Sequence, residues 1–227
     1  MDSPADLLLL SFVIALVVAV SAAAQSPQST PSSSSSSVQH ARKPAAAADS
    51  GPEAGSVRNG VYRNSGFGFT CKIPAGWVLR TEEMNASAEG EPAQASHKAA
   101  RVLLAAFSRP PEAKGEDVNS SILIVAENAA SYPGLKDAAQ YFGPLTEIAR
   151  QQGFDVINEA YEFAIGTKTL VRADFQKDVG SRVMLQSTLA MLARGYAVSI
   201  TFIGGTEDEV EELIAGLSFG AGVRSVK

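Results

Sequence analysis

The chain has 227 residues, with 24 acidic and 19 basic side chains and a formal net charge of −5 at pH 7. This mildly acidic composition has no basic stripe and no polybasic run, which argues against a nucleic-acid partner and against binding to an anionic membrane surface. Cys71 is the only cysteine, so the chain has no internal disulfide and its core must be stable without one.

Residues 1–24 have the pattern of a secretory signal peptide. Residues 7–20 are apolar except for Ser11, and a segment ending in three alanines follows. An apolar core before an Ala-x-Ala site is typical of such a signal, and this core is shorter than the ~20 residues that span a membrane. The first six residues carry two aspartates and no base, so an uncleaved anchor stays an alternative. We predict an exported protein, periplasmic or extracellular, with no stable membrane span after cleavage, and the alanine-rich composition indicates a bacterial source.

Composition divides the rest of the chain into three parts. Residues 25–56 are rich in Ser, Ala, Pro and Gln and hold one large apolar residue, Val38. Such a segment buries too little surface to offset its ordering entropy, so we predict a disordered linker. Residues 57–219 are predicted to form one domain with its own core, and residues 220–227 a flexible tail.

The first strand of this domain lies in the stretch YRNSGFGFTCKIPAGW, residues 62–77. Phe67, Phe69, Cys71 and Ile73 alternate with polar or small residues, which predicts a strand with one buried face. The alternation places the Cys71 thiol in the core and argues against a reactive site beside the glycines. We expect Trp77 to pack under the segment that follows.

Two continuous apolar runs come next, at residues 101–108 and 121–126, and both are expected to be central strands. Two long polar segments, residues 80–100 and 109–120, flank the first run and are expected to be loops that emerge at opposite ends of the sheet. Long loops are often functional, so either loop is a candidate binding surface, with a tolerated insertion as the alternative.

Four more strands are predicted at residues 155–165, 168–177, 182–192 and 196–202, and their short turns indicate an antiparallel meander. In the first of these strands, alternation predicts one shared face for five residues: Ile157, Glu159, Tyr161, Phe163 and Ile165.

Two helices complete the prediction. Residues 135–149 keep a helical apolar rhythm that ends before Gly153, with Gly143-Pro144 predicting a kink or a short break. Residues 206–217 begin with a capping box of Thr206 and Glu209. The predicted fold class is therefore α+β, with a central antiparallel sheet of about six to seven strands and two main helices.

The pattern Tyr62-x-Asn64, Gly66-Phe67-x-Phe69 and Ile73-Pro74-x-Gly76-Trp77 resembles the PsbP-like superfamily. This superfamily includes the extrinsic photosystem II protein and the DcrB-like and LpqN-like exported domains. The resemblance covers residues 57–219 and implies an α/β/α sandwich. Members mostly bind or assemble other proteins and share no catalytic constellation, so the resemblance implies no functional residue here.

Residue types that carry chemistry are sparse. His97 is the only histidine after the predicted linker, and it lies in a polar segment without an obvious orienting partner. One cysteine and two histidines cannot supply the usual ligands of a zinc site. The acidic residues of 207–212 lack a calcium-loop pattern and are interpreted as capping and solvated side chains. We predict no catalytic, metal or cofactor-binding residue, and no cofactor.

The hypothesis from the sequence is an exported, non-enzymatic domain that binds a protein, or a small molecule, in the cell envelope. One alternative is a hydrolase with a cryptic site built on carboxylates such as Glu159 or Asp174. The other is a purely structural domain of the envelope.

Overall fold

The structure is a computed structural model that describes residues 51–89, 100–113, 115 and 117–220. The predicted signal peptide, most of the predicted linker, His97 and the segment after residue 220 lie outside the described residues. The boundaries of the predicted domain therefore stay predictions.

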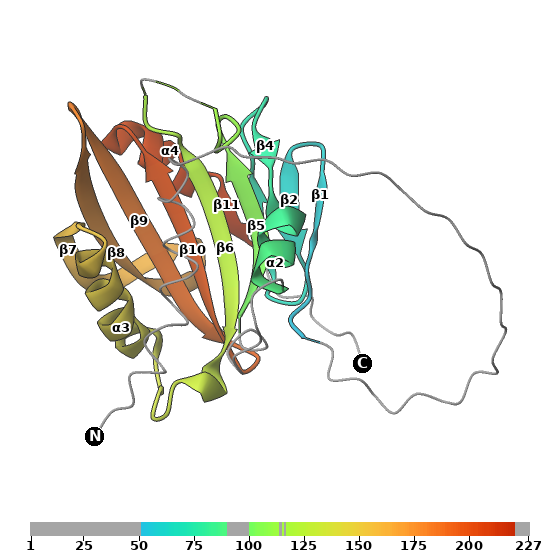
Figure 1. Ribbon diagram of the computed structural model, residues 1–227. Helices are drawn as coiled ribbons and strands as arrows, with labels where there is room; N and C mark the ends of the chain where they lie inside the picture. The colour runs from blue at the N-terminus through green and yellow to red at the C-terminus, as the bar shows by residue number, and fades with distance from the viewer. Residues whose placement is uncertain (1–50, 90–99, 114, 116, 221–227) are drawn as a thin grey trace, which may run out of the picture.

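Two antiparallel sheets form the fold (Figure 1). The larger sheet has seven strands in the order β4 (Val78–Leu79), β5 (Ala100–Phe107), β6 (Ser121–Asn128), β10 (Tyr196–Gly204), β9 (Arg182–Ala193), β8 (Lys168–Val179) and β7 (Asp155–Ile165). The smaller sheet has four strands in the order β1 (Ser56–Arg58), β2 (Val61–Asn64), β3 (Phe69–Lys72) and β11 (Leu217–Phe219). The α+β class and the seven-stranded sheet are confirmed, whereas a separate small sheet was not predicted.

The antiparallel meander is confirmed, since β7, β8, β9 and β10 pair in chain order. Its last turn shows why the local signal is strong. Arg194 and Gly195 both have positive φ, 53° and 81°, as in the two-residue turns that match the twist of a hairpin. β10 then pairs with β6, and β6 pairs with β5, so the two apolar runs β5 and β6 are both interior strands of the sheet.

The predicted single face of β7 is wrong in the first half of the strand. β-bulges shift its pairing with β8 between Val156 and Asn158 and again between Asn158 and Tyr161. An extra residue reverses the faces of the side chains that follow it. As a result Glu159 contacts Arg150 of the helix that follows η1 (Ala129–Ser131), while Tyr161 points to the other side of the sheet.

That helix, α3 (Ala138–Gln151), runs through Pro144 without interruption, so of the two predicted alternatives the short break is wrong and the kink stays a prediction. The missing N–H of Pro144 deprives only one carbonyl of its helical partner, that of the exposed residue Gln140. The predicted end is confirmed by a Schellman motif, in which the Phe154 N–H donates to the Ala149 carbonyl at 2.9 Å. Gly153 at this end has a φ of +83°.

The second predicted helix is α4 (Glu207–Ala215), which is shorter than expected at its end. Thr206 caps it by accepting a bond from the Glu209 N–H at 3.2 Å. The Glu209 carboxylate reaches back to the Gly205 N–H at 2.8 Å, one residue earlier than in a regular capping box. Leu217 was predicted to be helical, but it lies in β11 and pairs with Cys71 of β3.

A third helix, α2 (Thr81–Glu89), lies where a loop was predicted. Its polar side chains bond the outer edge of β5: Thr81 accepts from the Ala105 N–H at 2.9 Å, and Asn85 bonds both backbone groups of Val102. The expectation that this segment and residues 109–120 emerge at opposite ends is wrong at its start, because Arg80 forms an ion pair with Glu112 at 3.0 Å.

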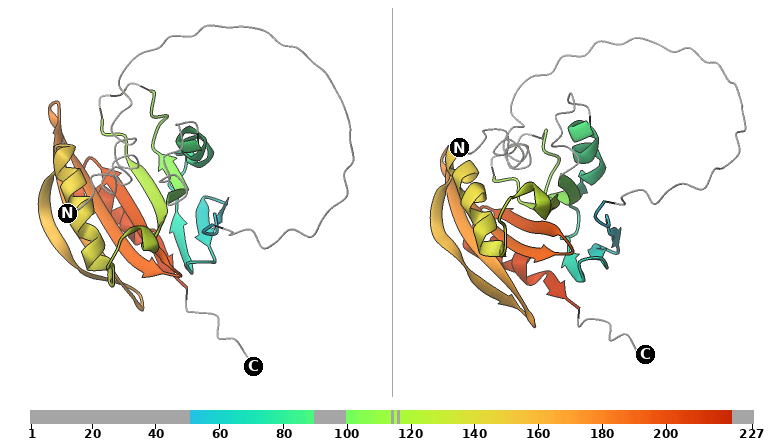
Figure 2. Two further views of the ribbon diagram at one scale, coloured as in Figure 1. Left: turned by 60° about the horizontal axis from the view of Figure 1, so that its bottom comes forward. Right: turned by 90° about the horizontal axis from the view of Figure 1, so that it is seen from below.

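The seven-stranded sheet is covered on both faces (Figure 2). The small sheet and α4 pack on one face, with Phe69, Cys71, Leu213 and Ile214 in the shared core. On the other face α3 packs on β8 and β9, and α2 brings Met84 onto β5 and β6. Within the described residues no helix is both long and apolar enough to cross a membrane.

Candidate functional site

The cysteine-containing strand is part of the core. Cys71 is 0% exposed and pairs with Tyr62 of β2 and Leu217 of β11, as the alternation of β3 predicts. Burial raises the pKa of its thiol to about 12, so almost no thiolate is present at neutral pH. This environment is that of an inert structural cysteine. Phe67, Ile73 and Trp77 are partly buried against the same core.

Alkylation of Cys71 is expected to be slow in the folded protein. Iodoacetamide should label the native chain more than about a hundredfold more slowly than the chain in 6 M guanidinium, because attack needs an exposed thiolate. Mass spectrometry follows this reaction directly, since the chain has one thiol. Rapid labelling of the native protein would restore the reactive-thiol interpretation.

The polar residues of the same stretch hold the first turns of the domain. The Asn64 amide, 0% exposed, donates to the Glu53 carbonyl at 2.8 Å and to the Tyr62 hydroxyl at 3.0 Å. Its oxygen accepts from the Phe67 N–H at 2.9 Å. The Tyr62 hydroxyl donates to the Ala54 carbonyl at 2.9 Å. These contacts give the Tyr-x-Asn pattern a structural role.

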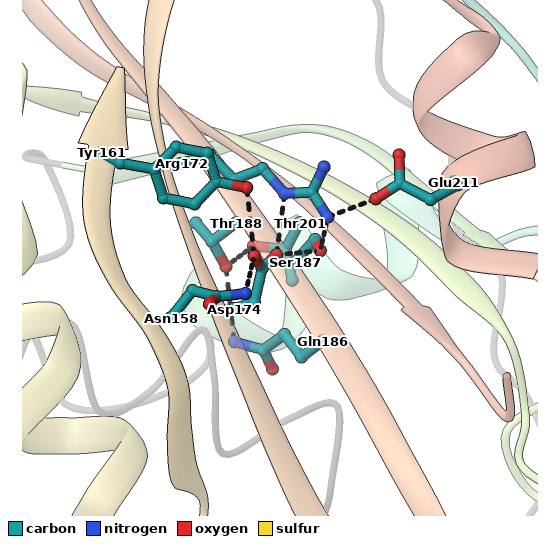
Figure 3. A network of polar contacts seen from close by, with 9 residues as sticks. All are labelled: Asn158, Tyr161, Arg172, Asp174, Gln186, Ser187, Thr188, Thr201 and Glu211. Carbon is teal, nitrogen blue, oxygen red and sulfur yellow. Dashed lines mark hydrogen bonds and ion pairs between the residues drawn. The ribbon is translucent and has the colours of Figure 1, made fainter. Parts of the chain in front are cut away.

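A buried polar network lies on the α4 side of the sheet and joins residues of β7, β8 and β9 (Figure 3). At its centre the Arg172 guanidinium donates to the Asp174 carboxylate at 2.7 Å, and both residues are less than a tenth exposed. Ser187, directly opposite Asp174 on β9, donates to the same carboxylate oxygen. Arg172 also reaches Glu211 of α4 at 2.5 Å. The network therefore ties the meander to the last helix.

The bulged strand β7 completes this network. Asn158 and Tyr161 donate to the second oxygen of Asp174, at 3.0 and 3.2 Å, although they are three residues apart. In a regular strand two residues at that spacing would face opposite sides. The bulge between them puts both side chains on the carboxylate. Both Asp174 oxygens thus accept bonds from neighbouring side chains.

The electrostatics of Asp174 are those of a stabilised anion. Burial raises the pKa of this carboxyl, but the hydrogen bonds that it accepts, first from Ser187 and then from Arg172, outweigh burial and hold its pKa below the ordinary value. Arg172 also lies 5.0 Å above the ring of Phe163. A carboxylate held in this way is a poor proton acceptor, so the arrangement favours a structural role.

Figure 3 also contains three residues that belong to the opposite face of the sheet. Strand alternation puts Gln186 and Thr188 on the face away from Ser187. There the Gln186 amide donates to Thr188 at 3.3 Å, and Thr188 shares a bond of 3.1 Å with Thr201 of β10. These buried polar groups are satisfied by one another across two strands.

The two carboxylates of the hydrolase alternative do not converge. Asp174 faces α4 inside the network, whereas Glu159 is exposed and forms an ion pair of 3.6 Å with Arg150 of α3 on the other face. No group of three or more metal-ligating side chains occurs in the part of the chain that the structure describes.

A second buried carboxyl has no basic partner among the contacts of the described residues. Glu127 at the end of β6 is 2% exposed. It accepts hydrogen bonds from the hydroxyls of Tyr132 and Tyr141, the latter at 3.0 Å, and the two rings meet edge to face at 5.4 Å. Burial raises the pKa of Glu127, and the two tyrosine bonds offset this only in part.

Glu127→Gln should change how stability depends on pH. A raised pKa in the folded state means that this group stabilises the fold below about pH 4.5 and loses that contribution as the pH rises through its folded pKa. The neutral amide does not titrate, so the variant should gain stability relative to the natural protein between pH 4 and pH 8. Urea unfolding at both pH values measures this, with exposed Glu212→Gln as the control for net charge. A difference in the free energy of unfolding between Glu127→Gln and the natural protein that is the same at both pH values, or that falls as the pH rises, would contradict the raised pKa of Glu127.

Sequence reasoning missed Arg172, Glu127 and Glu211 as members of buried networks. For Arg172 the available signal was the order Leu170-Val-Arg-Ala-Asp-Phe175, in which two opposite charges two residues apart alternate with apolar residues in one strand. Charges at this spacing share a face of the strand and can form an ion pair, and in the structure that face is covered by α4.

No protein-family model and no curated protein matches the chain. Similar solved structures include the cyanobacterial PsbP of Synechocystis sp. PCC 6803, with 16% identity, 70% of this chain and 91% of that chain covered, and a TM-score of 0.42. They also include the Ran-binding protein Mog1p of Saccharomyces cerevisiae, with 13% identity, coverage of 72% and 96%, and a TM-score of 0.38. LpqN of Mycobacterium tuberculosis, involved in cell envelope biogenesis, has 12% identity, coverage of 67% and 83%, and a TM-score of 0.34. Each is a structure to which the chain is similar, with a TM-score below 0.5, and the resemblance of the sequence pattern to the PsbP-like superfamily stays a resemblance.

Proposed function

We propose that this chain is an exported, non-enzymatic domain that binds a protein partner in the cell envelope. The observation that carries the proposal is the exposed strand β7. Ile157 and Tyr161 are 47% and 38% exposed on it, and the strand has a neighbour on one side only. Exposed aromatic and aliphatic side chains at an open sheet edge are the ordinary ingredients of a protein interface.

The non-enzymatic part of the proposal rests on how the ionisable side chains are used. Asp174 accepts bonds from four side chains and forms an ion pair, and Glu159 lies on the other face of the sheet. Acid–base chemistry needs a group with a free proton site close to the substrate. Asp174 has no such free site, and Glu159 lies on the other face of the sheet, where it cannot act together with Asp174.

Site-specific photo-crosslinking tests the proposal. A photoreactive residue placed at Ile157 should form a protein adduct of defined mass in the cell envelope. The matched positions Val57 and Leu79 are exposed apolar residues on β1 and β4 and should form none. Absence of adducts at all three positions would count against protein binding and favour the purely structural alternative. An adduct at Val57 or Leu79 alone would support protein binding but would place the binding surface at that strand instead of at β7.

A further inference from the structure

The edge at β7 differs from the other edges of the two sheets. β7 has 11 residues, about 36 Å of strand, and pairs with β8 alone. The opposite edge strand, β4, has two residues, and α2 bonds the exposed backbone of β5 beside it. The edges of the small sheet, β1 and β11, have three residues each. Only at β7 does the described chain leave a long row of backbone N–H and C=O groups without a strand partner.

The side chains of this edge are acidic. β7 carries Asp155, Glu159 and Glu162 and no basic residue. Glu162 pairs with Val171, whose side chain faces α3, so Glu162 lies on the same face as Glu159. One base is nearby: Arg150 contacts Glu159 at 3.6 Å with both side chains more than half exposed. A surface ion pair of this kind contributes little to stability, so Glu159 can exchange Arg150 for a basic residue of a partner.

The other face of the edge is apolar and aromatic. Tyr161 and Phe163 point toward α4 and form an edge-to-face ring pair at 6.4 Å. A strand added beside β7 would therefore meet Glu159 and Glu162 on the α3 face and the aromatic residues Tyr161 and Phe163 on the α4 face. In strand addition, specificity comes from side chains that alternate between the two faces of the added strand, so each face of β7 selects every second residue of the partner segment.

We infer that β7 receives an extended segment of the protein partner as an added strand, with Lys or Arg at alternate positions and apolar residues between them. The inference rests on the proposed function and names the partner's chemistry. Backbone hydrogen bonds supply the affinity, and the basic residues pair with Glu159 and Glu162 on the α3 face. The apolar residues of the added strand lie beside Tyr161.

A second copy of the chain fits this edge poorly. Two β7 strands side by side would bring six carboxylates to one seam without a basic residue from either strand. Like charges opposite one another destabilise strand pairing.

Hydrogen exchange with probe peptides tests the inference on the full chain. A ten-residue peptide that alternates Lys and Val should slow exchange of the amides of β7, with saturation at increasing peptide concentration. The same peptide with Glu in place of Lys should not, and a Lys–Val peptide N-methylated at alternate residues should bind at least tenfold more weakly. Glu159→Lys with Glu162→Lys should weaken binding about tenfold, since two attractive cross-strand pairs become repulsive. Asp208→Lys with Glu212→Lys makes the same change in net charge on exposed positions of α4 and should leave affinity within about twofold.

Three results would overturn the inference. The first is protection by the Lys–Val peptide of amides outside β7. The second is equal binding of the Lys–Val and Glu–Val peptides. The third is protection of β7 that depends on protein concentration alone. The last result would identify a second copy as the occupant. A partner crosslinked from a position outside β7 would reject the strand addition while leaving protein binding intact, so the two failures are distinguishable.

Discussion

Replacing Arg172 with methionine should lower the free energy of unfolding by about 3–5 kcal/mol. The change removes the guanidinium that bonds Asp174 at 2.7 Å, and it leaves that carboxylate buried without a cation. It also removes the tie to Glu211 and the contact with the Phe163 ring. Chemical denaturation with a fitted slope measures the loss, and an unchanged slope shows that the variant still folds to the same extent.

The double variant Arg172→Met with Asp174→Leu distinguishes the stability that the ion pair itself contributes from the cost of leaving one buried charge without a partner. Its loss should be clearly smaller than that of the single variant, because no buried charge remains. The pH dependence gives a second check. The pKa of Asp174 is lowered in the natural protein, so its contribution is present above the ordinary carboxyl pKa and is lost as the pH falls through the folded value. The difference in the free energy of unfolding between Arg172→Met and the natural protein should therefore become smaller as the pH is lowered. A single variant that loses less than about 1 kcal/mol would show that solvent screens the pair.

The features that sequence reasoning predicted correctly depend on neighbours in the chain. Thr206 caps α4 through an N–H three residues away, Gly153 ends α3, and Arg194-Gly195 turns one hairpin. The meander and the burial of Cys71 follow from alternation over a few residues. In each case the energetic reason lies within one element and the adjoining turn, so the pattern is visible without knowledge of the fold.

The features that it missed depend on contacts between distant segments. Arg172 and Glu211 are 39 residues apart, and only the packing of α4 on the sheet brings them together. Leu217 continues the helical pattern of α4, but pairing with Cys71, far earlier in the chain, draws it into β11. α2 is polar because its side chains bond the edge of β5, so it lacks the apolar stripe that identifies a helix. The bulges of β7 carry no Gly or Pro that would mark them, and they place Asn158 and Tyr161 on Asp174 of the neighbouring strand.

Asn64→Ala should destabilise the domain by about 2–3 kcal/mol, since it removes three hydrogen bonds from a residue that is 0% exposed. The Phe67 N–H, where β2 turns into β3, and the Glu53 carbonyl, in the segment before β1, would both lose their side-chain partner. The effect should also loosen the segment before β1, because Asn64 and Tyr62 bond the carbonyls of Glu53 and Ala54. Chemical denaturation measures the first effect, and faster proteolysis near Gly55 measures the second.

Gly55 explains why this segment depends so closely on the Tyr-x-Asn pair. Its φ is +73°, and a Cβ there would lie 2.6 Å from the Tyr62 hydroxyl, so the backbone is pressed against the ring. Ser65→Ala is the matched control: the Ser65 hydroxyl donates to the exposed Glu53 carboxylate at 2.7 Å, and its loss should cost less than about 0.5 kcal/mol. Equal losses for Asn64→Ala and Ser65→Ala would mean that water replaces the buried amide. In that case the stretch that resembles a family signature would mark only a turn. A large loss at Asn64 alone makes it the residue that joins the first hairpin to the chain preceding it.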